Sequence, residues 1–434
     1  MQMEERVIRR VTLRLLPFLV LCYFVSYLDR SNLGIAALTM NRALGISAQE
    51  YGFAAGIFFL GYIICEIPSN LLLVRFGARK WIARIMITWG LVAASMALVN
   101  SAQGLYITRI LLGIAEAGFF PGVIFYLTLW FPTTYRARIY GYFYLAIPLT
   151  IVVGAPLSAS LLYLDGVAGF AGWQWLFLVE SIPAVILGIV CFYYLTDTPE
   201  KATWLAHDER TWLTERLGRD AEQGESGKPS TMLMALTHPK LWLMSVVSLS
   251  LTACAYGIVF FLPQIVSEFG FSKIETGFIT AMPFLAGAIG MSLSGWSSDR
   301  TGERRLHLAI PSLIAAVGYL LAANVHGALP KLLFLGLAAF GTFAAYSPFW
   351  TFLPMFVKKR SAVAASIAVI NTVGSMAGFG APFAMGYVKQ HTGNYDLALL
   401  LIAGLAMLAA IIAYTFPKGQ EVRESAINMK PTRS

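Results

Sequence analysis

The sequence predicts an all-α membrane protein with twelve transmembrane helices arranged as two bundles of six. Three observations support this fold class. The 434 residues are 57% hydrophobic and only 13% charged, whereas an ordinary soluble chain is about one-quarter charged. Apolar runs of about 20 residues, the length that crosses a hydrocarbon core, recur along the whole chain. The second half of the chain also repeats the first. Backbone polar groups in lipid must pair within their own segment, so runs of this length are helices.

Short polar loops separate the apolar runs, and each run is interpreted as one transmembrane helix. The first run is too long for a secretion signal, contains Asp29 and Arg30, and has no small-residue cleavage site, so we expect it to be retained as a span. The expected spans are residues 12–37, 51–73, 81–100, 105–129, 138–163, 174–195, 241–268, 276–296, 306–324, 331–355, 362–388 and 395–416.

The positive charge is distributed by topology, so the net charge of +9 does not indicate a nucleic-acid partner. Of the 32 lysines and arginines, Arg30 and Arg109 lie deep within spans, and nearly all others lie in the tails, in alternate loops on one side or at the span ends next to them. By the positive-inside rule this side is the cytoplasm, and both termini are expected there. The loops on the opposite side carry only Arg42, Lys273, Lys331 and Lys389.

An internal repeat relates the two halves at an offset of about 225 residues. Residues 45–52 match residues 270–277, residues 70–80 match 295–305, and residues 154–156 match 380–382. Each match lies at a corresponding place in the two halves. A parallel repeat of two six-helix bundles, with a binding site between them, is a known plan of membrane transporters.

The repeat also predicts the domain boundaries. Residues 1–195 form the first bundle, 196–240 a cytoplasmic linker, 241–417 the second bundle and 418–434 a cytoplasmic tail. Within the linker, Trp204, Leu205, Trp212, Leu213 and Leu217 form an amphipathic pattern, which predicts a helix along the membrane surface. A Gly/Ser/Pro tether is expected at residues 224–230. A solvated linker is favoured over a site for a regulatory partner.

Ionisable side chains deep in a span are costly, so each is a candidate functional residue. The first span contains Asp29 and Arg30, and the fourth contains Arg109 and Glu116, which lie two helical turns apart on one face. These four charges sum to zero, so they could simply neutralise one another and lock the first bundle. Alternatively, protonation of the two carboxylates would leave two arginines to attract a carboxylate, which is a basis for proton–anion symport.

Several short motifs carry a more specific resemblance. The loop Gly295…Asp299-Arg300-x-Gly302-x-Arg304-Arg305 resembles the signature loop of the major facilitator superfamily, and its first-half counterpart has Val74 where that family has an acid. Further motifs resemble the anion:cation symporter family, whose members include permeases for tartrate, phthalate and sugar acids. These motifs begin at Tyr27-Leu-Asp-Arg-Ser-Asn32, Glu66-Ile-Pro-Ser-Asn70, Gly113-Ile-Ala-Glu, Trp130-Phe-Pro132 and Gly172-Trp-Gln-Trp.

The resemblance implies a role for each candidate residue. Asp29 and Glu116 are the expected proton-coupling residues, and Arg30 is the firmest substrate residue, whereas Arg109 either binds substrate or holds the acids in register. The other expected substrate-binding residues are Tyr27, Tyr62, Tyr346, Asn371 and Ser375; the expected gating residues are Glu66, Arg75, Asp299, Arg300 and Arg304. No cofactor is expected. No metal site is expected either, because the five histidines lie in loops or near span ends without ligand spacing.

The predicted function is proton-coupled import of a small organic anion, with a hydroxy-dicarboxylate such as tartrate favoured. The alternative is a uniporter or anion exchanger for an aromatic acid such as phthalate or hydroxyphenylacetate. A non-transporting membrane sensor is a weaker alternative, because no enlarged cytoplasmic domain is present. An enzyme is not expected, because the sequence shows no nucleophile–base set. The expected location is the bacterial inner membrane, where the chain would act as a monomer with the anion, protons and the lipid bilayer as its partners.

Overall fold

A computed structural model of the chain describes residues 2–222, 238–357 and 360–418. In these ranges, twelve helical segments are long and apolar enough to span a membrane, and no β-strand occurs. The predicted fold class is therefore confirmed. The expected tether at residues 224–230 and the tail beyond residue 418 lie outside the described ranges. The spans are Met3–Leu44, Ala48–Phe76, Ala78–Leu98, Ala102–Thr128, Thr133–Leu164, Gly172–Tyr194, Pro239–Ser267, Lys273–Thr301, Arg305–Asn324, Ala328–Phe352, Ser366–Thr392 and Asp396–Tyr414.

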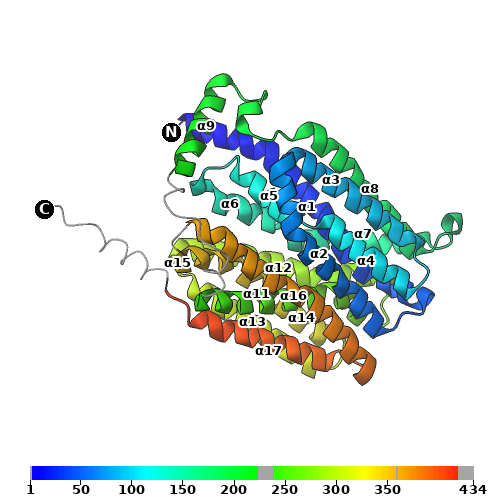
Figure 1. The fold of residues 1–434 in the computed structure, drawn as a ribbon. Coiled ribbons are helices and arrows are strands. Elements are labelled where there is room, and N and C mark those ends of the chain that lie inside the picture. The colour runs from blue at the N-terminus through cyan, green and yellow to red at the C-terminus, as the bar shows by residue number, and fades with distance from the viewer. Residues whose placement is uncertain (1, 223–237, 358–359, 419–434) are drawn as a thin grey trace. The chain divides into compact units, whose positions relative to one another are not determined.

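The chain divides into two compact units, and Figure 1 shows the helices of each. The first unit contains α1 to α9, and the second contains α11, α12 from Phe278 onward, and α13 to α17. The helices of the first unit are α1 (Gln2–Leu44), α2 (Ala48–Phe76), α3 (Ala78–Ser95), α4 (Ala102–Glu116), α5 (Phe119–Thr128), α6 (Thr133–Tyr144), α7 (Ala146–Leu161), α8 (Gly172–Tyr194) and α9 (His207–Glu222). Those of the second are α11 (Pro239–Ser267), α12 (Lys273–Thr301), α13 (Arg305–Asn324), α14 (Ala328–Phe349), α15 (Leu353–Phe356), α16 (Arg360–Thr392) and α17 (Asp396–Tyr414).

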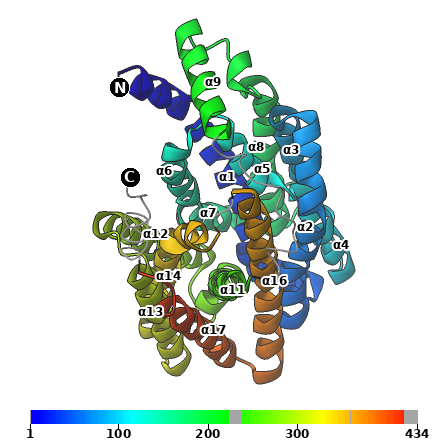
Figure 2. The same cartoon turned by 60° about the vertical axis from the view of Figure 1, so that its left-hand side comes forward.

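Corresponding helices pack in corresponding ways inside the two units. In the first unit α1 packs on α7 and α8, and α3 packs on α8 and α4. In the second unit α11 packs on α16 and α17, and α13 packs on α17 and α14; Figure 2 shows α11 nearly end-on among its neighbours. The backbone repeats as well: Gly77 ends α2 and Gly302 follows α12, both with positive φ (88° and 69°). The similarity at an offset of about 225 residues therefore reflects a repeated structure.

The fourth span is not one continuous helix, although its apolar run predicts one. Helix α4 ends at Glu116, and α5 begins at Phe119 after Gly118, which adopts a left-handed conformation (φ 84°). A Cβ at position 118 would lie 2.4 Å from Ser69 Oγ, so only glycine fits where α5 starts against α2. Interrupted helices are tolerated at membrane depth where protein buries the exposed backbone groups. The break places Glu116 at a helix end.

Helix α1 is much longer than the expected span of residues 12–37. Its 43 residues extend over about 65 Å at 1.5 Å per residue, roughly twice the thickness of a hydrocarbon core. Figures 1 and 2 both show the N-terminal end of α1 beside α9. There Glu209 pairs with Arg6 at 3.2 Å and with Arg10 at 2.6 Å. These ion pairs stabilise the charged extension of the helix beyond its apolar run.

The linker helix also differs from its prediction. Helix α9 begins at His207, where Glu209 accepts a hydrogen bond from the backbone N–H of Ala206 at 3.2 Å and so caps the first turn. Trp204 and Leu205 therefore precede the helix in a turn, and Trp204 stacks on Trp130 with ring centroids 5.4 Å apart. The linker packs against the first unit at this point.

The far end of α9 is attached to the first unit as well. The Asp220 carboxylate accepts a hydrogen bond from the backbone N–H of Thr133 at 2.8 Å, at the start of α6. Burial raises the pKa of Asp220, but the hydrogen bonds from Thr133 and the charges of Arg216 and Arg136 more than offset it, so the pKa lies below its usual value. Helix α9 thus contacts both α1 and α6 through its acidic residues.

Candidate functional site

The centre of the candidate site is an ion pair between Arg30 of α1 and Glu116 at the end of α4. The Arg30 guanidinium donates to Oε1 of Glu116, and the Ser26 hydroxyl donates to the same oxygen at 2.7 Å. Both charged side chains are buried, with 9% and 2% of their surface exposed. A buried pair of this kind costs desolvation energy that apolar side chains would not, so both residues are candidates for a functional role. The structure brings these two predicted residues together.

Aromatic rings surround the Arg30 guanidinium. Its central carbon lies 5.0 Å from the ring centroid of Phe58, 5.6 Å from Tyr62, and 5.9 Å from both Tyr27 and Phe59. At these distances the ring faces attract the cation. Two of the predicted substrate-binding residues, Tyr27 and Tyr62, are therefore at Arg30, whereas the sequence reasoning did not identify Phe58 or Phe59. The sequence motif around Tyr27 lies on α1 and did not predict that Phe58 and Phe59 of α2 contact Arg30.

The Asp29 side chain contacts a different helix from that of Arg30, its neighbour in sequence. Its Oδ2 accepts a hydrogen bond from the Trp89 indole N–H of α3 at 2.7 Å, and its Oδ1 has no hydrogen-bond partner in the part of the chain that the structure describes. The side chain is buried, and among the described residues it makes no ion pair. The four charges of the first bundle thus do not form a single neutral cluster. Trp89 was not identified from the sequence, since a tryptophan in an apolar span carries no distinguishing pattern.

Arg109 is completely buried and contacts backbone. Its Nε donates to the carbonyl oxygen of Ala54 at 3.2 Å and its Nη2 to that of Ala55 at 3.4 Å, both on α2. Its central carbon lies 4.9 Å from the Phe58 ring centroid, so this one ring contacts both arginines. Although Arg109 and Glu116 share a face of α4, the arginine contacts α2 and the carboxylate contacts α1.

Another buried carboxylate lies in the same unit. Glu180 of α8 accepts hydrogen bonds from the Asn32 side-chain amide at 2.9 Å and from the Ser158 hydroxyl at 2.6 Å. It is 2% exposed and, within the described part of the chain, has no cationic partner. With Asp29, Glu66 and Glu116 it makes four buried carboxylates in the spans of this unit for two buried arginines, two more than the sequence pattern of four charges counts.

The predicted substrate residues of the second unit lie on α14 and α16. The hydroxyl oxygens of Tyr346 and Thr252 are 3.3 Å apart, which joins α14 to α11. Asn371 and Ser375 are half-buried on α16, one turn apart. The second unit therefore has polar groups on α14 and α16, which both pack on α11, and it contains no buried arginine among its described residues.

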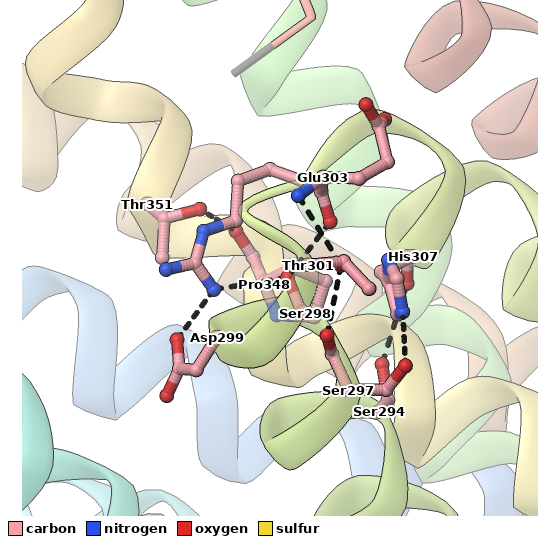
Figure 3. A network of polar contacts seen from close by, with 10 residues as sticks. Ser294, Ser297, Ser298, Asp299, Thr301, Glu303, His307, Pro348 and Thr351 are labelled. Atoms are coloured by element: carbon pink, nitrogen blue, oxygen red, sulfur yellow. Dashed lines mark hydrogen bonds and ion pairs between the residues drawn. The ribbon is translucent and has the colours of Figure 1, made fainter. Parts of the chain in front are cut away.

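The predicted gating residues of the second unit form a network around the loop between α12 and α13. Arg304 pairs with Asp299 at 2.6 Å and donates to the Ser298 hydroxyl at 2.9 Å, and Ser298 donates to the carbonyl oxygen of Glu303 at 3.0 Å. Figure 3 shows Asp299, Ser298 and Glu303 around this loop. Arg300 instead lies over the Trp296 ring at 5.4 Å. Within the predicted basic loop, Arg304 is thus paired with the acidic residue of the same motif, Asp299.

The corresponding loop of the first unit obtains its acid from another segment. Val74, which stands where an acid was expected, is 65% exposed. Asp197, three residues beyond the end of α8, accepts a hydrogen bond from the backbone N–H of Arg79 at 2.9 Å. Its second oxygen lies 3.9 Å from Arg79 Nε. An acid at the predicted loop is therefore present, but it comes from the segment that follows the sixth span rather than from the second span.

The remaining two predicted gating residues lie on α2. Arg75 lies over the Phe76 ring at 5.6 Å. Glu66 is buried, with 8% of its surface exposed, and its backbone carbonyl accepts a hydrogen bond from the Asn70 side chain at 2.8 Å. Both therefore lie in the half of α2 that leads to the Gly77–Arg79 loop.

The chain is similar in sequence to known membrane transporters. Residues 19–382 match the family model described as Major Facilitator Superfamily. A protein of Agrobacterium vitis named "Putative tartrate transporter" is 45% identical over 411 residues, 94% of each chain. The "Quinolone resistance transporter" of Acinetobacter baumannii is 38% identical over 99% of each chain. The "Inner membrane transport protein RhmT" of Escherichia coli is 35% identical over 98% of each chain.

Solved structures share the fold at lower sequence identity. The xylose transporter XylE from E. coli, in a partially occluded inward-open conformation, has a TM-score of 0.74 with 15% identity and covers 95% of this chain and 99% of its own. A bacterial homologue of the human lysosomal transporter Spinster has a TM-score of 0.73 with 17% identity, covering 92% of this chain and 95% of its own. At these identities the similarity shows the fold alone.

Proposed function

The chain belongs to the Major Facilitator Superfamily of membrane transporters, and we propose that it imports a small organic anion together with protons by alternating access. It is a multi-pass membrane transporter and not an enzyme. The observation that carries the proposal is the buried ion pair between Arg30 and Glu116, ringed by aromatic side chains. We further propose the bacterial inner membrane as its location, with both termini in the cytoplasm and a monomer as the working unit.

Arg30 is the proposed anchor for the anion. A guanidinium can bind a carboxylate through two parallel hydrogen bonds and stays protonated at any physiological pH. In the structure this guanidinium forms an ion pair with the Glu116 carboxylate. A substrate carboxylate and the Glu116 carboxylate would therefore compete for the same donor, and protonation of Glu116 would release Arg30. Proton binding and anion binding then favour each other, which is the thermodynamic requirement for symport.

Asp29 is the proposed second proton carrier. An ionised carboxylate without a cationic partner is costly to bury in a membrane span, and a bound proton removes that charge. With Glu66 and Glu180 included, the four buried carboxylates in the spans of the first unit exceed the two buried arginines by two negative charges when all are ionised. Two protonation steps would therefore neutralise the buried charge of these spans. Glu180, which already accepts two hydrogen bonds, is assigned a structural role.

A hydroxy-dicarboxylate such as tartrate is the proposed substrate. The similarity to the Agrobacterium vitis proteins supports this choice, and the hydroxyl groups of Tyr27 and Tyr62 near Arg30 could hydrogen-bond a hydroxy acid. Tyr346, Asn371 and Ser375 of the second unit are proposed to contact the rest of the molecule. Asp299, Arg300, Arg304, Arg75 and Glu66 are proposed to serve the gate.

An aromatic acid is the second candidate substrate. The specific observation in its favour is that four aromatic rings lie within 6 Å of the Arg30 guanidinium carbon, a setting that suits a planar ring bearing a carboxylate. A relative named for quinolone resistance, at 38% identity, adds some support. The two candidates differ in whether the hydroxyls or the ring faces around Arg30 bind the cargo.

The test uses purified protein in liposomes that contain a pH dye, with equal pH inside and outside. External tartrate, phthalate, hydroxyphenylacetate and uncharged xylose are added in turn. Internal acidification with one acid, lost in Glu116→Gln and kept in Glu215→Gln, supports proton–anion symport and names the substrate. Glu215 is 63% exposed on α9 and controls for removal of a carboxylate. Entry of radiolabelled acid at constant internal pH would mean a uniporter or exchanger and would refute the coupling scheme.

A further inference from the structure

A basic hollow lies where α1 leaves its apolar run, away from the Arg30 site. It has a volume of about 850 Å³ and is lined by Arg6, Arg9, Arg10 and Arg14 from successive turns of α1, with Glu5 as its acidic lining residue. Tyr194 and Trp204 form its aromatic wall. All of these residues belong to the first unit. Nothing in the proposed transport mechanism uses them.

Among the residues that the structure describes, two of the four arginines have acidic partners and two do not. Arg6 and Arg10 pair with Glu209 of α9, and Arg6 also approaches Asp208 at 3.4 Å. Arg9 is exposed, and within the described part of the chain neither Arg9 nor Arg14 makes an ion pair. The buried Nε of Arg14 also has no hydrogen-bond acceptor there. The hollow therefore has unused donors and positive charge of the kind that binds an oxyanion.

The Arg14 guanidinium is held in place by aromatic rings. Its central carbon lies 4.6 Å from the ring centroid of Tyr194 and 5.0 Å from that of Trp204. The Tyr194 hydroxyl also donates to the backbone carbonyl of Arg14 at 2.8 Å. A guanidinium fixed in this way loses less conformational entropy when it binds a ligand than a freely rotating one.

The position of the hollow indicates which oxyanion it meets. Tyr194 is the last residue of the sixth span, and the apolar run of α1 begins just after Arg14. From these two span ends we expect the hollow to lie at the level of the headgroups. Exposed apolar side chains continue from it along the two helices: Leu13 is 64% exposed, Phe192 40% and Tyr193 80%. Arginines above an apolar surface match a molecule with a phosphate at one end and acyl chains at the other.

We propose that this hollow is a binding site for the phosphate of an anionic phospholipid, with Arg9 and Arg14 as its principal donors. Arg10 shares its charge between Glu209 and the site. Because Glu209 and Trp204 attach the linker to α1 at the same place, a bound headgroup would also contact the junction between α1 and α9. A zwitterionic lipid would gain less, since its headgroup carries its own cation.

The test is native mass spectrometry of the full-length protein in detergent with added dioctanoyl phosphatidylglycerol, dioctanoyl phosphatidylcholine or inorganic phosphate. We expect phosphatidylglycerol to bind at least about tenfold more tightly than phosphatidylcholine, with an affinity that falls as salt rises. Arg9→Gln together with Arg14→Gln should lower that affinity at least about tenfold. Arg9→Gln alone, at an exposed position that leaves the fold intact, should lower it several-fold.

Arg84→Gln is the matched control, because Arg84 also lies over a tryptophan ring, that of Trp81 at 4.6 Å, but outside the hollow. It should bind phosphatidylglycerol like the unmodified protein. Equal binding of phosphatidylglycerol by the double variant and the unmodified protein would overturn the proposal, as would equal binding of the two lipids. If equimolar inorganic phosphate displaces the lipid, the hollow is a site for free phosphate and the lipid assignment is wrong.

Discussion

Trp89 donates its indole N–H to the carboxylate of Asp29 at 2.7 Å, and this contact separates Asp29 from the arginine that follows it in the sequence. Arg30 turns instead to Glu116. The two adjacent charges of α1 thus contact different helices, α3 and α4. Glu116 is therefore bound to a cation and Asp29 to a neutral donor, and these two settings belong to the two proposed proton carriers.

Asp29→Asn should preserve the fold and abolish coupling. The amide oxygen of asparagine can still accept the Trp89 hydrogen bond, but the side chain cannot carry a proton. We expect exchange of labelled substrate across liposomes with substrate on both sides to continue, and accumulation driven by a pH gradient to be lost. Asp208→Asn, at a position 55% exposed on α9, serves as the control. Accumulation at the unmodified level in Asp29→Asn would exclude Asp29 as a proton carrier.

Arg30→Lys should lower the affinity for the anion. Lysine keeps the positive charge that Glu116 needs but loses the planar pair of donors that grips a carboxylate, so we expect a fall in kcat/KM of about tenfold to hundredfold. Most of that fall should appear in KM. The measurement is the concentration dependence of uptake, with thermal stability followed in parallel. A KM unchanged by the substitution would mean that Arg30 does not bind the substrate.

Arg109→Gln should act on stability more than on substrate affinity. The side chain loses charge-assisted hydrogen bonds to the carbonyl groups of Ala54 and Ala55, which at about 1.5–3 kcal/mol each hold α4 to α2. We therefore expect a lower Tm and weaker expression, with KM nearly unchanged in the protein that remains. A large rise in KM at unchanged Tm would instead assign Arg109 to substrate binding, the other role that the sequence allows.

Gly113→Ala should disrupt the contact between α4 and α2. A Cβ at position 113 would lie 2.0 Å from the carbonyl oxygen of Phe58, a backbone atom that cannot move without shifting the rings around Arg30. Overpacking of this kind costs about 1–3 kcal/mol or more, so we expect a lower Tm and weaker uptake. Gly141→Ala, where nothing lies within 4 Å of the added carbon, is the matched control and should be tolerated. Equal stability of the two variants would contradict the packing argument.

Asp197→Ala should loosen the loop between α2 and α3. It removes the acceptor for the backbone N–H of Arg79 and the nearby negative charge, at a cost of about 1–2 kcal/mol. We expect slower uptake with little change in KM, because Asp197 is distant in sequence from Arg30 and contacts Arg79 instead. Val74→Ala is the control at the exposed position where the acid was expected. Unchanged uptake in Asp197→Ala would show that this loop needs no acid.

The sequence by itself determined the number of spans, their helical nature and the repeat of the two halves. These follow from the length of apolar runs, from the requirement that backbone groups in lipid pair internally, and from matches at one offset. It also identified Arg30 and Glu116 as candidate site residues, because ionisable groups are so rare in spans that each single one indicates a possible function.

Tertiary structure alone decided which charges meet. Seven residues of spacing put Arg109 and Glu116 on one face of a helix, yet one contacts α2 and the other α1. The break after Glu116, the indole at Asp29, and the use of Asp197 in place of an acid at position 74 likewise depend on neighbours far away in the chain. A helical pattern specifies the face on which a side chain lies. The partner it finds there depends on how the helices pack, which single-residue spacing does not encode.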